Sequence, residues 1–102
     1  MERTDLTQLN KLERYLKENG IQYDRIDQEQ DLNTGKPERH QIMVPSRFSW
    51  EWDAVCQFGS YGWQEGLLET MGILVAPDYG DSVEGHLTAD EMIERIEALN
   101  HE

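Results

Sequence analysis

The one cysteine of this sequence, Cys56, is the side chain with the clearest capacity for covalent catalysis. A cysteine nucleophile requires a nearby base and a third group that orients the base, and His40 and Asp53 are the candidates. However, Asp53 and Cys56 are an odd number of residues apart on one predicted strand, so their side chains should point to opposite faces. Cys56 should instead share an apolar face with Trp52 and Phe58. We therefore interpret it as a small buried hydrophobic residue.

A zinc site would have to combine this thiol with the three histidines, none of which has the short paired spacing of a recognisable site. The four residues are Cys56, His40, His86 and His101. Asp78, Asp81 and Glu84 lie in one predicted loop and offer the oxygen ligands that calcium or magnesium takes, but not in the order of an EF-hand. The sequence therefore predicts no metal and no other cofactor. A weak divalent-cation site in 78–84 stays an open alternative.

The segment GSYGWQEG, residues 59–66, has the glycines of a phosphate-binding loop. Such loops bring backbone N–H groups to an anion at a helix N-terminus. The lysine and the serine or threonine of a nucleotide-binding loop are missing here, and Glu65 and Glu69 would compete with a bound anion. We interpret the segment as a corner where a strand gives way to a helix. Tyr61 and Trp63 either anchor a protein partner or cover the edge of the core.

The chain of 102 residues has the size of one domain, residues 1–102. No apolar run approaches the roughly 20 residues of a membrane span, and the first residues lack the order of a secretory signal. A single cysteine cannot form an internal disulfide, which suits a reducing compartment. We therefore expect a small cytoplasmic protein without a membrane partner, whose oligomeric state the sequence leaves open.

Acidic side chains dominate the composition, with 21 Asp and Glu against 9 Lys and Arg and a net charge of −12. The excess is uneven along the chain. Residues 1–59 have 11 acidic and 8 basic side chains, whereas residues 60–102 have 10 acidic side chains and Arg95 as their only base. A negative field repels nucleic acid and anionic membranes and attracts basic surfaces. We therefore expect no direct nucleic-acid binding; the alternative for the charge is a role in solubility alone.

The first half of the chain predicts one helix followed by three strands. Leucines near the N-terminus recur at three- and four-residue steps, which indicates an amphipathic helix. Asp5 with Gln8 resembles a capping box at the start of this helix. The strands are predicted at 21–27, 40–44 and 50–58.

The third of these strands, WEWDAVCQF, alternates most clearly between apolar and polar residues. Period-two alternation with one wet face favours an antiparallel sheet. The apolar face consists of Trp50, Trp52, Ala54, Cys56 and Phe58. The opposite face consists of Glu51, Asp53 and Gln57, with Val55 as an apolar exception.

The second half predicts two further helices and one or two short strands. Helical spacing links Trp63 to Met71, a strand is predicted at 73–76, and a weaker strand lies between Val83 and Leu87. A capping box at residues 88–91 opens the last helix. The fold class is α+β, a small antiparallel sheet with about three helices packed mainly on one face, in the order α-β-β-β-α-β-(β)-α.

The last helix has an acidic stripe opposite its apolar stripe. Asp90, Glu94 and Glu97 lie about 5–6 Å apart at helical spacing, where like charges repel. Together with the corner and the 78–84 loop, this stripe predicts a negative surface that imitates a phosphate backbone. The alternative is an ordinary solvated helix face. The predicted contacts are Glu65, Glu69, Asp78, Asp81, Glu84, Asp90, Glu94 and Glu97.

The run from Trp52 to Ile96, WDAVCQFGSYGWQEGLLETMG followed by VEGHLTADEMIERI, resembles small uncharacterised proteins of gut Firmicutes and of their prophages and mobile elements. The resemblance covers a little under half of the chain, and GSYGWQEGLLE is its most distinctive part. It implies no catalytic or binding residue. It implies a setting, because small acidic proteins of mobile elements are often accessory factors that inhibit host machinery, including defence enzymes such as CRISPR effectors.

These patterns together predict a non-enzymatic interaction protein whose acidic face blocks a basic nucleic-acid-binding protein. One alternative is a protein-binding or self-associating module that uses the aromatic residues Tyr61 and Trp63. Another is a small enzyme or a weak metal-binding module.

Overall fold

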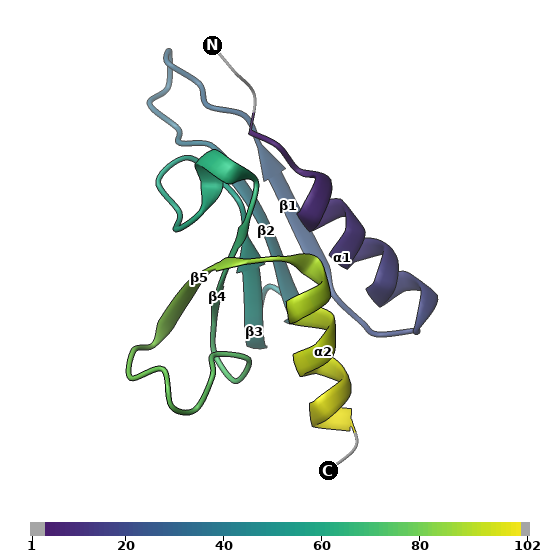
Figure 1. Cartoon of the computed structure of the whole chain (residues 1–102). Helices are drawn as coiled ribbons and strands as arrows, with labels where there is room; N and C mark the ends of the chain where they lie inside the picture. The colour runs from purple at the N-terminus through teal and green to yellow at the C-terminus, as the bar shows by residue number, and fades with distance from the viewer. Residues whose placement is uncertain (1–3, 101–102) are drawn as a thin grey trace.

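The computed structural model describes residues 4–100 and shows a five-stranded antiparallel sheet with two α-helices over one face (Figure 1). The elements in chain order are α1 (Thr7–Glu18), β1 (Asp24–Gln28), β2 (Arg39–Pro45), β3 (Trp50–Val55), the 3₁₀ turn η1 (Trp63–Glu65), β4 (Leu68–Met71), β5 (Val83–Leu87) and α2 (Ala89–Asn100). The predicted α+β class and the antiparallel sheet are confirmed. The described residues contain two α-helices rather than about three.

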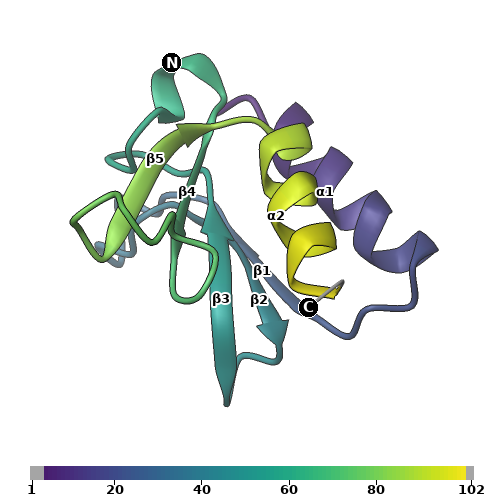
Figure 2. The same ribbon diagram turned by 60° about the horizontal axis from the view of Figure 1, so that its bottom comes forward.

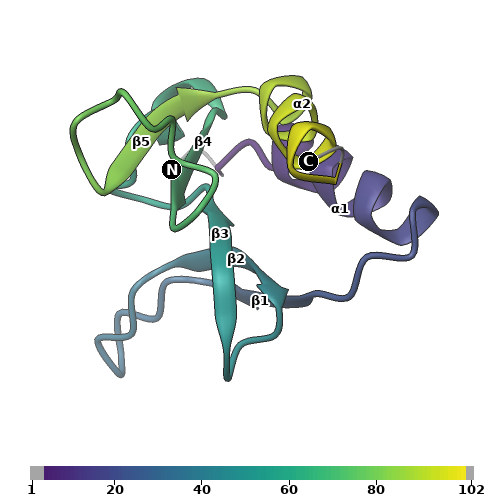
Figure 3. The same ribbon diagram turned by 90° about the horizontal axis from the view of Figure 1, so that it is seen from below.

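The strands are neighbours in the order of the sequence, β1-β2-β3-β4-β5, and every neighbouring pair is antiparallel. β3 and β4 are joined less extensively than the other pairs, through Val55 opposite Glu69 and an isolated bridge between Trp52 and Gly72. Figures 2 and 3 show that β4 and β5 turn away from the plane of β1 to β3. The sheet is therefore bent at β3, on the side where α2 returns.

The core lies between the helices and the sheet. Leu9, Leu12 and Leu16 of α1 are fully buried, and Met92 and Ile96 of α2 are buried beside them, as the helical spacing predicted. Burying such a side chain contributes about 1.5–3 kcal/mol. The sheet and its loops complete the core with Ile42, Val44, Trp52, Ala54, Cys56, Leu68, Leu74 and Leu87.

The capping interactions connect the two helix N-termini. The capping box of α2 is confirmed, because the Glu91 N–H donates to Thr88 Oγ1 at 3.2 Å and the Thr88 N–H donates to Glu91 Oε1 at 3.0 Å. Asp5 accepts a hydrogen bond from the Thr7 N–H at 2.9 Å. Gln8, predicted to complete a capping box in α1, instead accepts a hydrogen bond from the Ala89 N–H at 2.7 Å.

The predicted helix from Trp63 to Met71 is wrong. Glycines with positive φ bracket η1, Gly62 at 96° and Gly66 at 71°, so the helical turn stops after three residues. The chain then alternates as strand β4, with Leu68 and Thr70 fully buried. The strand predicted at 73–76 is also wrong: these residues form a turn, whereas the weaker strand predicted from Val83 to Leu87 exists as β5.

The predicted faces of the third strand are partly wrong. Trp52, Ala54 and Cys56 are buried, but Phe58 is 69% exposed because β3 ends at Val55 and the chain turns before reaching it. Trp50, at the first position of β3, is 39% exposed. Asp53 is buried on the predicted wet face, where the Met71 N–H and the Gln41 amide donate to its carboxylate at 2.9 and 2.8 Å.

Candidate functional site

Arg95, the only Lys or Arg between residues 60 and 102, is half-buried and paired within the molecule. Its guanidinium donates to both carboxylate oxygens of Glu84, at 2.7 and 2.9 Å, and to the Leu74 carbonyl at 3.0 Å. Glu84 also accepts a hydrogen bond from the Ala76 N–H at 3.0 Å. We call these contacts the Arg95 clamp. The clamp ties α2 to β5 and to the turn that follows β4.

The electrostatics of the clamp keep both partners charged. Hydrogen bonds from Arg95 lower the pKa of Glu84, although partial burial opposes the shift. The hydrogen bonds to Glu84 raise the pKa of Arg95, and the charges of Glu91 and Asp78 act in the same direction. The loop that contains Asp78 therefore lies within electrostatic reach of Arg95 on α2.

Exposed carboxylates lie in the loop after β4 and along α2. Asp78 and Glu91 are near Arg95, whereas Asp90 and Glu97 are on the side of α2 that faces α1. Asp90 has an ion pair, with Lys11 of α1 at 2.9 Å, and both side chains are well exposed. We define the acidic surface as the exposed residues Asp78, Asp81, Asp90, Glu91, Glu94 and Glu97. Among the described residues, the members other than Asp90 form no ion pair.

Three of the predicted contacts lie apart from this surface. Glu84 is buried in the clamp and is not available to a partner. Glu65 lies in η1 of the corner and Glu69 lies in β4, next to the corner; the corner and the acidic loop are at opposite ends of β4 (Figure 1). Glu65 faces His86 at 3.4 Å, and Glu69 accepts a hydrogen bond from the Tyr61 N–H at 3.2 Å. The predicted single negative surface is therefore divided.

The corner at residues 59–66 presents aromatic side chains. Phe58 and Trp63 pack with ring centroids 4.9 Å apart and an interplanar angle of 50°. Phe58 and Tyr61 are exposed, whereas Trp63 is half-buried. Sequence reasoning selected Tyr61 and Trp63 but assigned Phe58 to the core. The corner connects two strands, not a strand and a helix, so no α-helix N-terminus faces an anion here.

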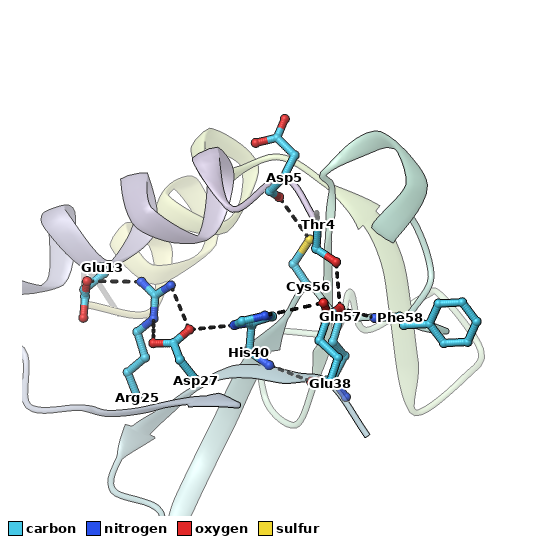
Figure 4. Close-up of polar contacts among 10 residues, drawn as sticks. All are labelled: Thr4, Asp5, Glu13, Arg25, Asp27, Glu38, His40, Cys56, Gln57 and Phe58. Atoms are coloured by element: carbon cyan, nitrogen blue, oxygen red, sulfur yellow. Dashed lines mark hydrogen bonds and ion pairs between the residues drawn. The ribbon is translucent and has the colours of Figure 1, made fainter. Parts of the chain in front are cut away.

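A chain of charged side chains runs from α1 along β1 to the start of β2 (Figure 4). Arg25 contacts Glu13 at 3.2 Å and Asp27 at 2.9 Å. Asp27 in turn contacts Nδ1 of the buried His40 at 2.7 Å, and Nε2 of His40 faces Glu38 at 3.7 Å. We call Glu13, Arg25, Asp27, His40 and Glu38 the His40 network.

Asp27 is ionised in this network. Partial burial would raise its pKa, but hydrogen bonds from His40 and Arg25 outweigh that effect and lower it. An ionised carboxylate can only accept, so the His40 Nδ1 must carry the proton in this contact. Sequence reasoning assigned no role to Glu13, Arg25, Asp27 or Glu38, because each looks like an ordinary surface charge in the sequence.

The candidate catalytic group of Cys56, His40 and Asp53 is not assembled. Asp53 binds the Met71 amide and Gln41, so it does not orient His40, whose Nδ1 binds Asp27 instead. The Cys56 Sγ lies 3.5 Å from the Asp5 carbonyl in the core. Burial raises the pKa of the Cys56 thiol to about 11.

Cys56 should therefore react slowly with thiol reagents while the protein is folded. At pH 8 the thiolate fraction at a pKa of about 11 is about 0.001, so modification by a disulfide reagent should be at least about 100-fold slower than in guanidinium chloride. The absorbance change during modification, followed over time for the folded and the unfolded protein, gives both rates. Equal rates would show that the thiol is accessible and that its assignment to the core is wrong.

The predicted metal ligands are not brought together. Glu84 points into the clamp rather than toward Asp78 and Asp81. Cys56 and His86 are not grouped with other ligand side chains in the described part of the chain, and His101 lies outside it. Within residues 4–100, one group of three side chains has the geometry to share a metal ion: Glu29, Glu38 and His40.

No protein-family model, curated protein or solved structure matches this chain. Among residues 4–100, every helix is too short or too polar to cross a lipid bilayer. The acidic surface, the aromatic corner and the His40 network are therefore candidate functional sites.

Proposed function

We propose that this chain is a non-enzymatic interaction protein that binds a basic surface of another protein through its acidic surface. The observation that carries the proposal is the Arg95 clamp. Because Glu84 pairs with Arg95, the only Lys or Arg of residues 60–102, the charge of Arg95 is largely compensated by Glu84 and offsets the exposed carboxylates only in part. Lys11 of α1 offsets only Asp90. Asp78, Asp81, Glu94 and Glu97 form no ion pair with the described residues and can meet the cations of a partner, whereas Glu91 is held by Thr88 in the capping box.

Complementary charge would give such a partner fast and selective association. A negative surface attracts a basic groove over about one Debye length, about 8 Å at physiological salt. Basic grooves are typical of proteins that hold nucleic acid. We therefore propose that the acidic surface replaces nucleic acid in the groove of such a protein and inhibits it.

We infer the setting from the sequence resemblance alone. The resemblance of residues 52–96 to small proteins of prophages and mobile elements favours an inhibitor of a host defence enzyme, of the kind that acts against CRISPR effectors. The reduced thiol of Cys56 is compatible with the cytoplasm, where such enzymes work.

Charge reversal on α2 tests the acidic surface. Glu94→Lys with Glu97→Lys should weaken partner binding at least about tenfold, because each reversal turns an attraction of roughly 1 kcal/mol into a repulsion. Both side chains are exposed, so the fold should be retained. Binding to the partner is measured by titration at low salt, and circular dichroism confirms the fold.

The matched control is Glu18→Lys with Glu51→Lys, which changes the net charge by the same amount at exposed sites outside the acidic surface. It should bind much more tightly than the α2 double variant. Equal weakening by both pairs would mean that net charge alone acts, and unchanged binding by the α2 pair would contradict the proposed surface.

A second candidate function is association through the aromatic corner. The observation that favours it is the exposed pair of Phe58 and Tyr61 beside Trp63, because exposed aromatic side chains are enriched at binding hot spots. Such binding should survive high salt. Sedimentation in high salt should show a complex or dimer for the native sequence and its loss in the variant with Phe58→Ser and Tyr61→Ser. No difference between the two proteins would exclude this candidate.

A further inference from the structure

His40 has one ring nitrogen fixed and the other available. Its Nδ1–H donates to Asp27 at 2.7 Å, so in the neutral ring the lone pair lies on Nε2. The side chain is only 4% exposed. No described residue comes within hydrogen-bond distance of Nε2, since the nearest charged atom is Glu38 Oε2 at 3.7 Å. A buried imidazole oriented through Nδ1 by a carboxylate is the usual arrangement of a metal-binding histidine.

Glu38 is held in a similar way. Its Oε1 accepts hydrogen bonds from the Thr4 hydroxyl at 2.6 Å and from the Phe58 N–H at 2.7 Å. These contacts fix the carboxylate and direct Oε2 toward His40 (Figure 4). Glu38 Oε2 and His40 Nε2 therefore face one another at 3.7 Å. Thr4 and Phe58 hold Glu38, and Asp27 holds His40.

Glu29 supplies a third ligand from the other side of the β1–β2 connection. It follows β1 directly, and its carboxylate lies within 4.8 Å of the ligand atoms of Glu38 and His40. Two zinc ligands at about 2.1 Å in tetrahedral geometry are about 3.4 Å apart. Glu38 Oε2 and His40 Nε2, 3.7 Å apart, are already close to this spacing, and Glu29 is exposed, so a small movement of its side chain would complete the site.

We propose that Glu29, Glu38 and His40 bind a divalent transition-metal ion, for which zinc is the best match. One imidazole and two carboxylates form a borderline set of donors, and such sets favour zinc over calcium or magnesium. Asp27 acts as a positioning residue, because it holds the tautomer and orientation of His40. The ion would close the base of the loop between β1 and β2 and leave a position for water or a ligand. This inference is independent of the proposed function of the acidic surface.

Calorimetric titration of metal-free protein with zinc chloride tests the site. The native sequence should bind one zinc ion in a saturable step, and its melting temperature should rise in the presence of zinc. Magnesium at the same concentration should bind at least about 100-fold more weakly. Weak binding of several zinc ions, with no saturable step, would mean that the exposed carboxylates bind zinc nonspecifically, and would overturn the proposal.

Variants assign the ligands. Glu29→Gln and His40→Gln should each weaken zinc binding about 100-fold or more, and Asp27→Asn about 10- to 100-fold. Glu29 is exposed, so its variant remains informative if His40→Gln fails to fold. His86→Gln is the matched control, since His86 also faces a glutamate but on the exposed corner, and it should bind zinc as the native protein does. Full affinity in Glu29→Gln, or loss in His86→Gln, would contradict the assignment.

Discussion

Replacing Arg95 by methionine should lower the free energy of unfolding by about 2–3 kcal/mol. The substitution leaves the Glu84 carboxylate buried without its cation, and breaking a buried pair in this way costs about 3–5 kcal/mol. The value should be smaller here because the Arg95 side chain is 27% exposed and solvent screens part of the interaction. Denaturant unfolding of the native and variant proteins at pH 7 measures the difference.

The cost of Arg95→Met should depend on pH. The pKa of Glu84 is lowered in the folded protein, so its contribution is present above the unfolded pKa of about 4.5 and is lost as the pH falls through the folded value. The difference between the two proteins should therefore shrink below about pH 4.5. Lys11→Met, which removes the exposed partner of Asp90, should cost less than about 1 kcal/mol. If Arg95→Met lowered the free energy of unfolding no more than Lys11→Met does, the structural role of Arg95 would be contradicted.

Gly72→Ala should destabilise the protein by at least about 3 kcal/mol. Gly72 has a φ of 93° and lies against β3, where an added Cβ would overlap the Glu51 carbonyl oxygen and lie 2.9 Å from the Trp52 Cα. A positive φ alone costs a non-glycine residue about 1–2 kcal/mol. To relieve the overlap, the backbone around Gly72 would have to move away from β3, and this movement would break the bridge between Gly72 and Trp52. Thermal unfolding with the native protein as reference measures the loss.

Gly80→Ala separates the two contributions. Gly80 has a φ of 83°, but an added Cβ would meet nothing within 4 Å. This control should cost only about 1–2 kcal/mol, the conformational part of the effect. Equal melting temperatures of the two variants would show that Gly72 does not lie closely against β3 and would contradict the bend of the sheet.

The periodic parts of the fold could be predicted from the sequence. The leucine spacing of α1 and the apolar stripe of α2 confine burial to one helix face, so type and orientation follow together. The alternation of β3 likewise predicted an antiparallel sheet. The helix expected at 63–71 failed because Trp63, Leu67 and Met71 satisfy helical spacing by coincidence, while Gly66 interrupts the backbone and Leu68 and Thr70 alternate into the core.

The candidate sites were less predictable, because they depend on contacts between distant residues. Counting charges predicted an acidic C-terminal half, but only the fold pairs Arg95 with Glu84 and moves Glu84 out of the exposed set. The His40 network joins α1, both strands of the first hairpin and the residues after β3. A histidine and two glutamates without motif spacing give no signal until β1 and β2 pair.

The acidic surface is tested most directly by capture of proteins from a cell lysate on the immobilised protein, with elution in a rising salt gradient. The proposed function predicts that a nucleic-acid-binding protein is retained at low salt, released at moderate salt and displaced by added DNA. The Glu94→Lys, Glu97→Lys variant should not retain it. Retention that persists in high salt or in this variant, or no retained nucleic-acid-binding protein at all, would contradict binding through the acidic surface.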